Sequence, residues 1–226
     1  MEKADLVKLL VGREPEVIIR TLAMMADNPA IGRVLEEGSV VRFSDLMAEE
    51  IPRIYSTLIQ GSFDSWHADT CTRILKDFKT AKGQKLSYGQ AQKPLNVFLK
   101  VYVDWAKLPS LELAEKLIPL LHCPLDSVLM KFMKREFSAL YEEQIGSLRR
   151  HKVDRITERA KEIAGGSSRA VAKRIVGNEF SLTAIDKEIY LQWQHFLRTL
   201  WPGKRVQLDI IWVLERRPGS GEVATA

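Results

Sequence analysis

The chain of 226 residues is 46% hydrophobic and 28% charged, which is typical of a globular protein with a sizeable core. Its net charge of +5 and isoelectric point near 9.2 favour a polyanionic partner such as nucleic acid, although many globular proteins reach similar values. Two cysteines, Cys71 and Cys123, are too few for a disulfide framework and lack the paired spacing of a zinc site, so the composition excludes a disulfide-stapled secreted domain and indicates a reducing compartment.

Hydrophobic residues recur at helical spacing through the first third of the chain, interrupted at Asn28-Pro29 and Gly61-Ser62. The helices predicted there are Leu6–Leu10, Val17–Met25, Leu46–Ile59 and Cys71–Phe78. After a turn at residues 81–83, the predicted helices are Pro94–Trp105, Leu111–Leu121 and, beyond the break at His122-Cys123-Pro124, Leu125–Tyr141. The short connections indicate a packed bundle, so the predicted fold class is all-α.

The last third continues the helical pattern with one ambiguous segment. Predicted helices are Val153–Ile163, Arg169–Val176 and a helix ending near Trp201 whose start has the capping-box spacing of Thr183 with Asp186. Val206–Leu214 is the one candidate strand, and its length leaves strand and helix both open. The tail at 217–226 is small and polar and is expected to be disordered.

None of these segments has the roughly 20 consecutive apolar residues that span a bilayer, and the N-terminus lacks the apolar core of a signal peptide. We therefore expect a cytoplasmic protein without membrane contact. A monomer without metal or cofactor is the simplest expectation.

A polar stripe follows the predicted helix after Lys93. At 100° per residue, Lys93, Asn96, Lys100 and Asp104 fall on one side, and apolar residues cover most of the remaining circumference. This stripe has two interpretations. It is either the solvated edge of a core helix with an ordinary Lys100–Asp104 pair, or a functional surface set into a buried helix.

Two segments flank this helix. Residues 86–93 have the small side chains of a hairpin, whose backbone N–H groups near a helix N-terminus suit a phosphate. Asp126 follows Pro124 at the start of the next predicted helix, where its carboxylate can cap the helix.

The pattern Gly89-x-Ala91-x-Lys93, followed by an apolar helix and Pro124-Leu125-Asp126, resembles the catalytic core of helix-hairpin-helix DNA glycosylases. That family has a G-x-G-x-K hairpin and a P-V-D motif, so Ala91 departs from it. The interval from Lys to Asp is most similar to archaeal 8-oxoguanine DNA glycosylases. The segments around Lys93 to Lys100 and His122 to Asp126 also resemble antiphage glycosylases that remove glucosylated hydroxymethylcytosine from viral DNA.

The resemblance implies two helical lobes with a cleft between them, within a single domain over residues 1–216 whose catalytic core is about 84–130. Lys93 would attack C1′ of a flipped nucleotide, and Asp126 would stabilise the charge developing on the sugar. The other implied residues are Gly89, Gln90, Ala91 and Gln92 for DNA phosphates, and Asn96, Lys100, Asp104 and His122 for the substrate. Only a neutral amine attacks, so if Lys93 stays charged, Asp126 would instead activate water without strand cleavage.

The implied partner is double-stranded DNA that contains a modified base. We favour a bulky base such as glucosylated hydroxymethylcytosine in antiviral defence, with an 8-oxoguanine repair glycosylase/lyase as the alternative. A non-enzymatic helix-hairpin-helix DNA-binding module and a protein that binds a partner helix are the competing classes.

Two further groups of residues have both a functional and a structural interpretation. The aromatic side chains that would stack on a flipped base or pack in the core are Trp66, Tyr88, Trp105, Trp193 and Trp201. The cations that would contact phosphates or form a solvated face are Arg149, Arg150, His151, Lys152, Arg155, Arg169, Lys173 and Arg174.

Overall fold

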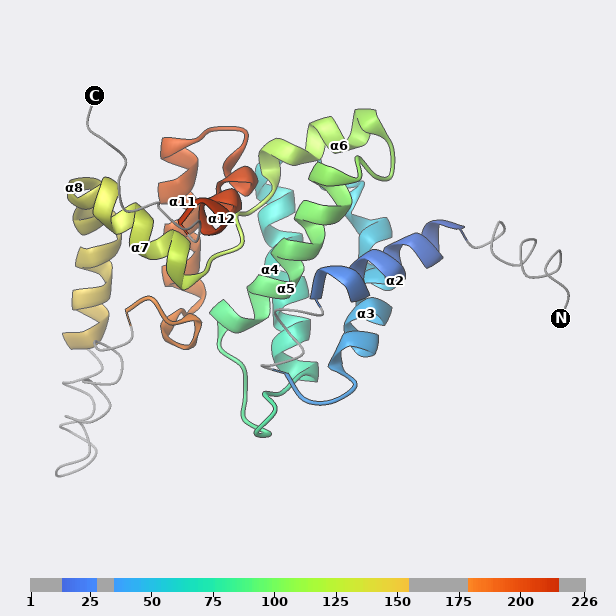
Figure 1. Cartoon of the computed structure of the whole chain (residues 1–226), viewed down its shortest axis with the longest axis horizontal. Helices are drawn as coiled ribbons and strands as arrows, with labels where there is room; N and C mark the ends of the chain where they lie inside the picture. Colours follow the sequence, from blue (N-terminus) through green and yellow to red (C-terminus); the bar gives the residue numbers. More distant parts are fainter. Residues whose placement is uncertain (1–13, 28–34, 155–178, 216–226) are drawn as a thin grey trace, which may run out of the picture. The chain divides into compact units, whose positions relative to one another are not determined.

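The computed structural model describes residues 14–27, 35–154 and 179–215, and these are predominantly helical (Figure 1). Within them there are two isolated β-bridges and no strand, so the prediction of an all-α fold is confirmed. The internal contacts divide the chain into two compact units, 1–86 with 91–122 and 87–90 with 123–226. The predictions for Leu6–Leu10, Arg169–Val176 and the tail at 217–226, and that for Val153–Ile163 beyond its first two residues, lie outside the described residues.

Unit 1 is built from helices that follow the predicted apolar pattern. Its elements are α2 (Glu14–Asp27), α3 (Ser39–Ile54), α4 (Gln60–Asp77), α5 (Tyr88–Leu99), the π-helix η1 (Lys100–Trp105), α6 (Leu111–Leu117) and the 3₁₀ turn η2 (Ile118–Leu120). The first three residues of α5 belong to unit 2. Phe43 of α3 meets Phe98 of α5 edge to face, with ring centroids 6.3 Å apart, in the core of this unit.

A buried carboxylate joins α3 to α4 in unit 1. Glu50 is 1% exposed and accepts hydrogen bonds from Trp66 Nε1 at 3.1 Å and Arg53 Nη1 at 3.0 Å, and it also pairs with Arg73. Because several donors surround Glu50, the cost of burying its charge is offset.

Unit 2 contains a second set of helices. These are α7 (Ser127–Glu136), α8 (Ser138–Tyr141), the π-helix η3 (Glu142–Gly146) continued by helical residues 147–154, η4 (Leu182–Ala184), α11 (Lys187–Leu200), η5 (Arg205–Ile210) and α12 (Ile211–Glu215). Trp193 of α11 contacts Tyr141 and Phe196 through ring centroid distances of 5.5 Å, and all three side chains are buried. These aromatic rings form much of the core of this unit.

The structure decides one open question in unit 2 and corrects one prediction. Val206–Leu214, for which strand and helix were both open, is helical, as a 3₁₀ segment followed by α12. The capping box of Thr183 with Asp186 does not form, because Thr183 lies in η4 and Asp186 itself is the N-cap of α11, accepting from the Ile189 N–H at 2.9 Å. The helix begins one turn later than the pattern suggested.

No helix in the described part of the chain is long and apolar enough to cross a membrane. Cys71 and Cys123 are both buried.

Candidate active site

The segment expected to form a hairpin before Lys93 is instead the beginning of a helix. Ser87 and Gln90 cap α5 reciprocally: Ser87 Oγ accepts from the Gln90 N–H at 3.1 Å, and Gln90 Oε1 accepts from the Ser87 N–H at 2.9 Å. This S-x-x-Q pattern satisfies two backbone donors at the start of a helix, which is why α5 begins at Tyr88 rather than after Lys93.

Gly89 is packed too closely for any larger residue. A Cβ atom at this position would lie 2.4 Å from the backbone oxygen of Leu182 and 2.8 Å from Cβ of Ile185. The Gly89 N–H donates to the Ile185 oxygen at 3.0 Å, and both partners belong to unit 2. The glycine therefore serves close packing against residues 182–185.

The N–H groups of Gly89 and Gln90 have partners within the chain, and Ala91 and Gln92 are fully buried. The role predicted for these four residues in phosphate binding stays a prediction. A phosphate that used the Gly89 N–H would have to replace the Ile185 oxygen.

We expect Gly89→Ala to lower the free energy of unfolding by about 1 to 3 kcal/mol, since the added methyl group meets backbone atoms that cannot rotate away. Urea denaturation measures the change. The matched control is Gly61→Ala in the first turn of α4, where nothing lies within 4 Å of the added Cβ atom and alanine favours the helix. Equal stability of the Gly89→Ala protein and the wild type would contradict the packing role.

The polar stripe on α5 and η1 is buried rather than solvated. Asn96, Lys100 and Asp104 are 0%, 7% and 6% exposed, which excludes its interpretation as a solvated helix edge. Lys93 is half-buried. The segment predicted as one α-helix from Pro94 to Trp105 changes at Lys100 into a π-helix, so the last turn is wider than the 100° rule assumes.

Asn96 anchors a hydrogen-bonded chain inside unit 1. Its Nδ2 donates to Gln92 Oε1 at 2.6 Å, and its Oδ1 lies 2.7 Å from Nε2 of His67 on α4. His122 Nε2 lies 2.8 Å from Asp64 Oδ1, and the rings of His67 and His122 are 4.3 Å apart. We call Asp64, His67, Gln92, Asn96 and His122 the histidine cluster.

Two members of the histidine cluster, Asp64 and His67, were not predicted from the sequence. Asp64, His67 and Cys71 recur at intervals of three and four residues, so they share one face of α4, and Cys71 Sγ lies 3.8 Å from His67 Nδ1. Polar residues at this spacing among the apolar residues of one helix face are the signal that would have found them.

The remaining stripe residues have contacts near the end of η1. Lys100 Nζ lies 4.6 Å from the ring centroid of Trp105, and Lys107 Nζ lies 3.4 Å from Asp104 Oδ1. Burial raises the pKa of Tyr102 on the same π-helix, and a hydrogen bond with Tyr55 raises it further. Tyr102 therefore stays a neutral hydrogen-bonding group at physiological pH.

Asp126 is the N-cap of α7, as predicted. Its Oδ1 accepts from the Leu129 N–H at 2.8 Å, and the side chain is half-buried. A carboxylate at this position also interacts favourably with the helix dipole. Asp126 belongs to unit 2 and Lys93 to unit 1, and their joint role in catalysis stays a prediction.

The candidate stacking aromatics differ in exposure. Trp66, Tyr88 and Trp193 are buried, whereas Trp105 is 66% exposed and Trp201 is 36% exposed. Among the five, Trp105 therefore presents the largest fraction of its surface to a ligand.

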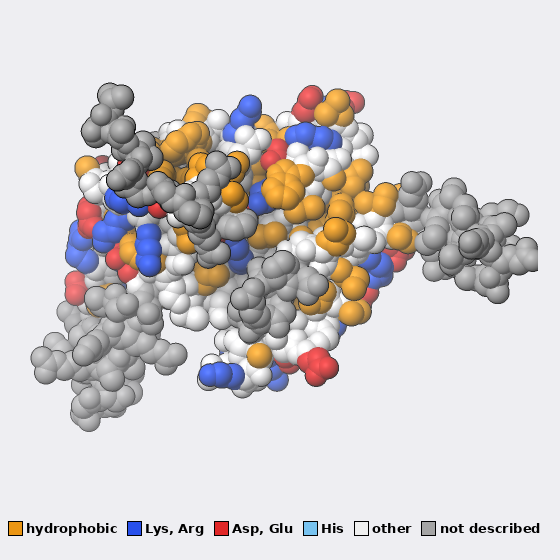
Figure 2. Space-filling view, in the orientation of Figure 1, with side chains coloured by type: hydrophobic (Ala, Val, Ile, Leu, Met, Phe, Trp, Pro, Cys, Tyr) orange, Lys and Arg blue, Asp and Glu red, His pale blue; other side chains and the backbone are white. Residues whose placement is uncertain are grey.

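Two members of the predicted cationic cluster near residue 150 pair with acids. Arg150 pairs with Glu142 at 2.6 Å, and Lys152 pairs with Asp186 at 2.5 Å. Figure 2 shows blue and red side chains interleaved at the left edge of the view, where α7 and α8 lie. Arg155, Arg169, Lys173 and Arg174 lie outside the described residues.

Comparison with models of protein families, with curated proteins and with solved structures finds no match to this chain. Among the residues that the structure describes, no group of three or more His, Cys, Asp or Glu side chains is arranged to hold a metal ion.

Proposed function

We propose that the protein is a DNA glycosylase that excises a modified base, with Lys93 as nucleophile and Asp126 as the stabilising carboxylate. The observation that carries the proposal is the fixed position of Asp126, whose Oδ1 is held by the Leu129 N–H at the N-terminus of α7. A carboxylate held by a rigid helix needs little reorganisation when positive charge develops beside it. Lys93, half-buried on α5, supplies an amine on an equally rigid element.

The proposed reaction uses the lone pair of the neutral Lys93 amine. The amine forms a bond to C1′ while the bond from C1′ to the base breaks, and the electron pair of that bond leaves with the base, which takes a proton from solvent. The sugar passes through an oxocarbenium-like state that the negative charge of Asp126 stabilises more than the neutral ground state. Loss of a proton from the attached amine and opening of the sugar ring then give a Schiff base.

The buried stripe and the histidine cluster support a polar substrate. Asn96 and His122 already bond to neighbours in the histidine cluster, so a substrate would use them by replacing those contacts, and Lys100 and Asp104 add opposite charges on η1. Prearranged polar groups discriminate strongly between ligands that do and do not satisfy them. A hexose-bearing cytosine presents many hydroxyl groups, so glucosylated hydroxymethylcytosine is the base that we favour.

Trp105 supports the extrusion step. An exposed indole with a lysine amine 4.6 Å from its ring centroid combines a stacking surface with a positive charge. Enzymes that act on a base inside duplex DNA first remove it from the stack, and exposed aromatic side chains stabilise the unstacked bases.

The test of this proposal is incubation of the protein with duplex DNA that carries glucosylated hydroxymethylcytosine, 8-oxoguanine, uracil or only normal bases. Alkali then cleaves the strand at abasic sites, and electrophoresis measures the product. We expect release of the glucosylated base at a rate at least tenfold above that of the other substrates. Selective release of 8-oxoguanine would keep the glycosylase assignment and change the substrate, whereas binding without abasic sites on any duplex would contradict the proposal.

A further inference from the structure

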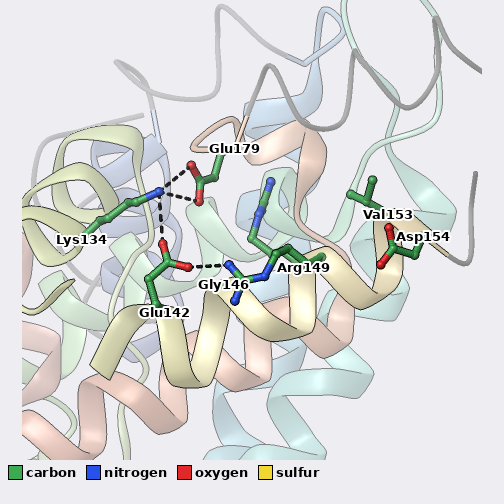
Figure 3. Close-up of a pocket in the computed structure, with 8 residues that line it drawn as sticks. Lys134, Glu142, Gly146, Arg149, Val153, Asp154 and Glu179 are labelled. Atoms are coloured by element: carbon green, nitrogen blue, oxygen red, sulfur yellow. Dashed lines mark hydrogen bonds and ion pairs between the residues drawn. The ribbon is translucent and has the colours of Figure 1, made fainter. Parts of the chain in front are cut away.

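We infer that a cavity beside Arg149, within unit 2, binds a phosphate group. The cavity has a volume of about 210 Å³, and the charged side chains that line it are Lys134, Glu142, Arg149, Arg150, Asp154 and Glu179 (Figure 3). This site is separate from the residues proposed for base excision, and the inference stands whether or not a base is released.

Arg149 is the residue that requires a ligand. Its side chain is only 8% exposed, and its Nη1 has no hydrogen-bond partner among the residues that the structure describes. A buried guanidinium nitrogen without an acceptor is costly, because it has lost water and gained no compensating hydrogen bond. An anion that enters the cavity would supply that acceptor, and the planar fork of arginine fits two oxygens of one phosphate.

Two of the three acids that line the cavity, Glu142 and Glu179, pair with other donors. Lys134 Nζ lies 3.5 Å from Glu142 Oε1 and 3.2 Å from Glu179 Oε2, and Arg150 Nη1 lies 2.6 Å from Glu142 Oε2. In Figure 3 the Arg149 side chain extends away from the Glu142–Arg150 pair, and none of the marked interactions reaches it. Lys134 and Arg150 thus compensate the negative charges of Glu142 and Glu179. These two acids leave the positive charge of Arg149 uncompensated.

Tyr141 also binds the Glu179 carboxylate. Its hydroxyl donates to Glu179 Oε1, and burial together with this hydrogen bond raises the pKa of Tyr141, so the phenol remains a neutral donor. Asp154 is exposed, where water and salt screen its charge. An incoming anion therefore meets Arg149 as the dominant charge inside the cavity.

Gly146 leaves room for the Glu142 carboxylate beside Arg150. A Cβ atom on Gly146 would lie 2.3 Å from Glu142 Oε2, so a larger residue would make this side chain shift. Glu142 and Gly146 are the two ends of the π-helix η3, and such wide turns occur frequently at functional sites.

A phosphate suits this cavity better than a carboxylate does. Two of its oxygens can accept from the arginine fork while the others accept from water, whereas a carboxylate has only two oxygens. The phosphate could belong to a free phosphate ester or to the backbone of DNA, and the test below separates these two sources.

The first test is thermal denaturation in sodium phosphate and in sodium chloride at matched ionic strength. At ten times the dissociation constant, we expect phosphate to raise the melting temperature of the wild type by about 3 to 5 °C more than chloride does. The Arg149→Met variant should not show this additional rise of the melting temperature in phosphate. Its melting temperature in chloride should equal or exceed that of the wild type, because an apolar side chain replaces a buried charge.

The control variant is Arg135→Gln, which removes an exposed arginine on α7 that does not line the cavity and should keep the full increment. Phosphorus NMR of the wild type is a second measurement, and it needs no variant. We expect the protein to broaden the phosphate signal and the broadening to saturate. An increment of the same size in Arg149→Met, or broadening that never saturates, would overturn the site and show an adventitious ion effect only.

The second test identifies the source of the phosphate with a 15-base-pair unmodified duplex. If the DNA backbone enters the cavity, Arg149→Met should reduce the slope of log affinity against log salt by about one. An unchanged slope, with the Arg149-dependent thermal increment retained, assigns the cavity to a free phosphate ester. Either result supports the site, and neither depends on excision of a base.

Discussion

Asp126→Asn should reduce base excision by about 10³-fold while leaving affinity for duplex DNA within about twofold, a loss typical of removing one preorganised charge from an active site. Asparagine has nearly the shape of aspartate and caps helices equally well, so its side-chain oxygen can still accept from the Leu129 N–H. Only the negative charge disappears. Single-turnover excision rates and equilibrium DNA binding, measured on the same preparations, separate the two effects.

The chain provides a matched control for this substitution. Asp186 caps α11 with the geometry that Asp126 has at α7, through a 2.9 Å hydrogen bond from the Ile189 N–H. Asp186→Asn should keep the cap of α11 and leave excision unchanged, and it also removes the charge that pairs with Lys152. Normal excision by Asp126→Asn would remove the carboxylate from the mechanism, and an equal loss in both variants would indicate a folding effect.

Helices and caps were the features most accessible to prediction from the sequence. The apolar spacing of Leu111–Leu121 and Leu125–Tyr141 and the position of Asp126 after Pro124 depend on interactions within one or two helical turns. Such local signals can be interpreted without knowledge of the rest of the fold. The N-cap of α7 was found for this reason.

One error and one open alternative arose where two local signals compete. Residues 86–93 contain small side chains that favour a turn, and they also contain Ser87 and Gln90 at capping-box spacing, which decided the structure. Val206–Leu214 is rich in β-branched residues, but the described residues offer no neighbouring strand for it to pair with, so it forms helical turns.

The burial of the polar stripe could not be predicted from the sequence. An amphipathic pattern places Asn96 and Lys100 on one face of a helix, but whether that face meets water or another helix is decided by residues far away in the chain. The contact between Asn96 and His67 joins α5 to α4, and no spacing rule within either helix predicts it. The histidine cluster is a tertiary feature in this sense.

Lys93→Gln should abolish the covalent adduct that borohydride traps between the wild-type protein and its substrate. Borohydride reduces the carbon-nitrogen double bond of a Schiff base to a stable single bond, so only an amine bonded to the sugar carbon is captured. Glutamine has no nucleophilic amine, and excision should fall by at least about 10³-fold, as expected when a catalytic nucleophile is removed. Denaturing electrophoresis of labelled DNA measures both products.

The control for Lys93→Gln is Lys116→Gln, which removes an exposed lysine of unit 1 that pairs with Glu112 at the surface. It should form the trapped adduct at the wild-type level, because exposed ion pairs contribute little to stability. A wild-type protein that excises the base but forms no adduct would exclude Lys93 as the nucleophile and would leave Asp126 to activate water. An adduct that persists in Lys93→Gln would instead require another amine of the chain to attack, and peptide mapping of the trapped species would identify it.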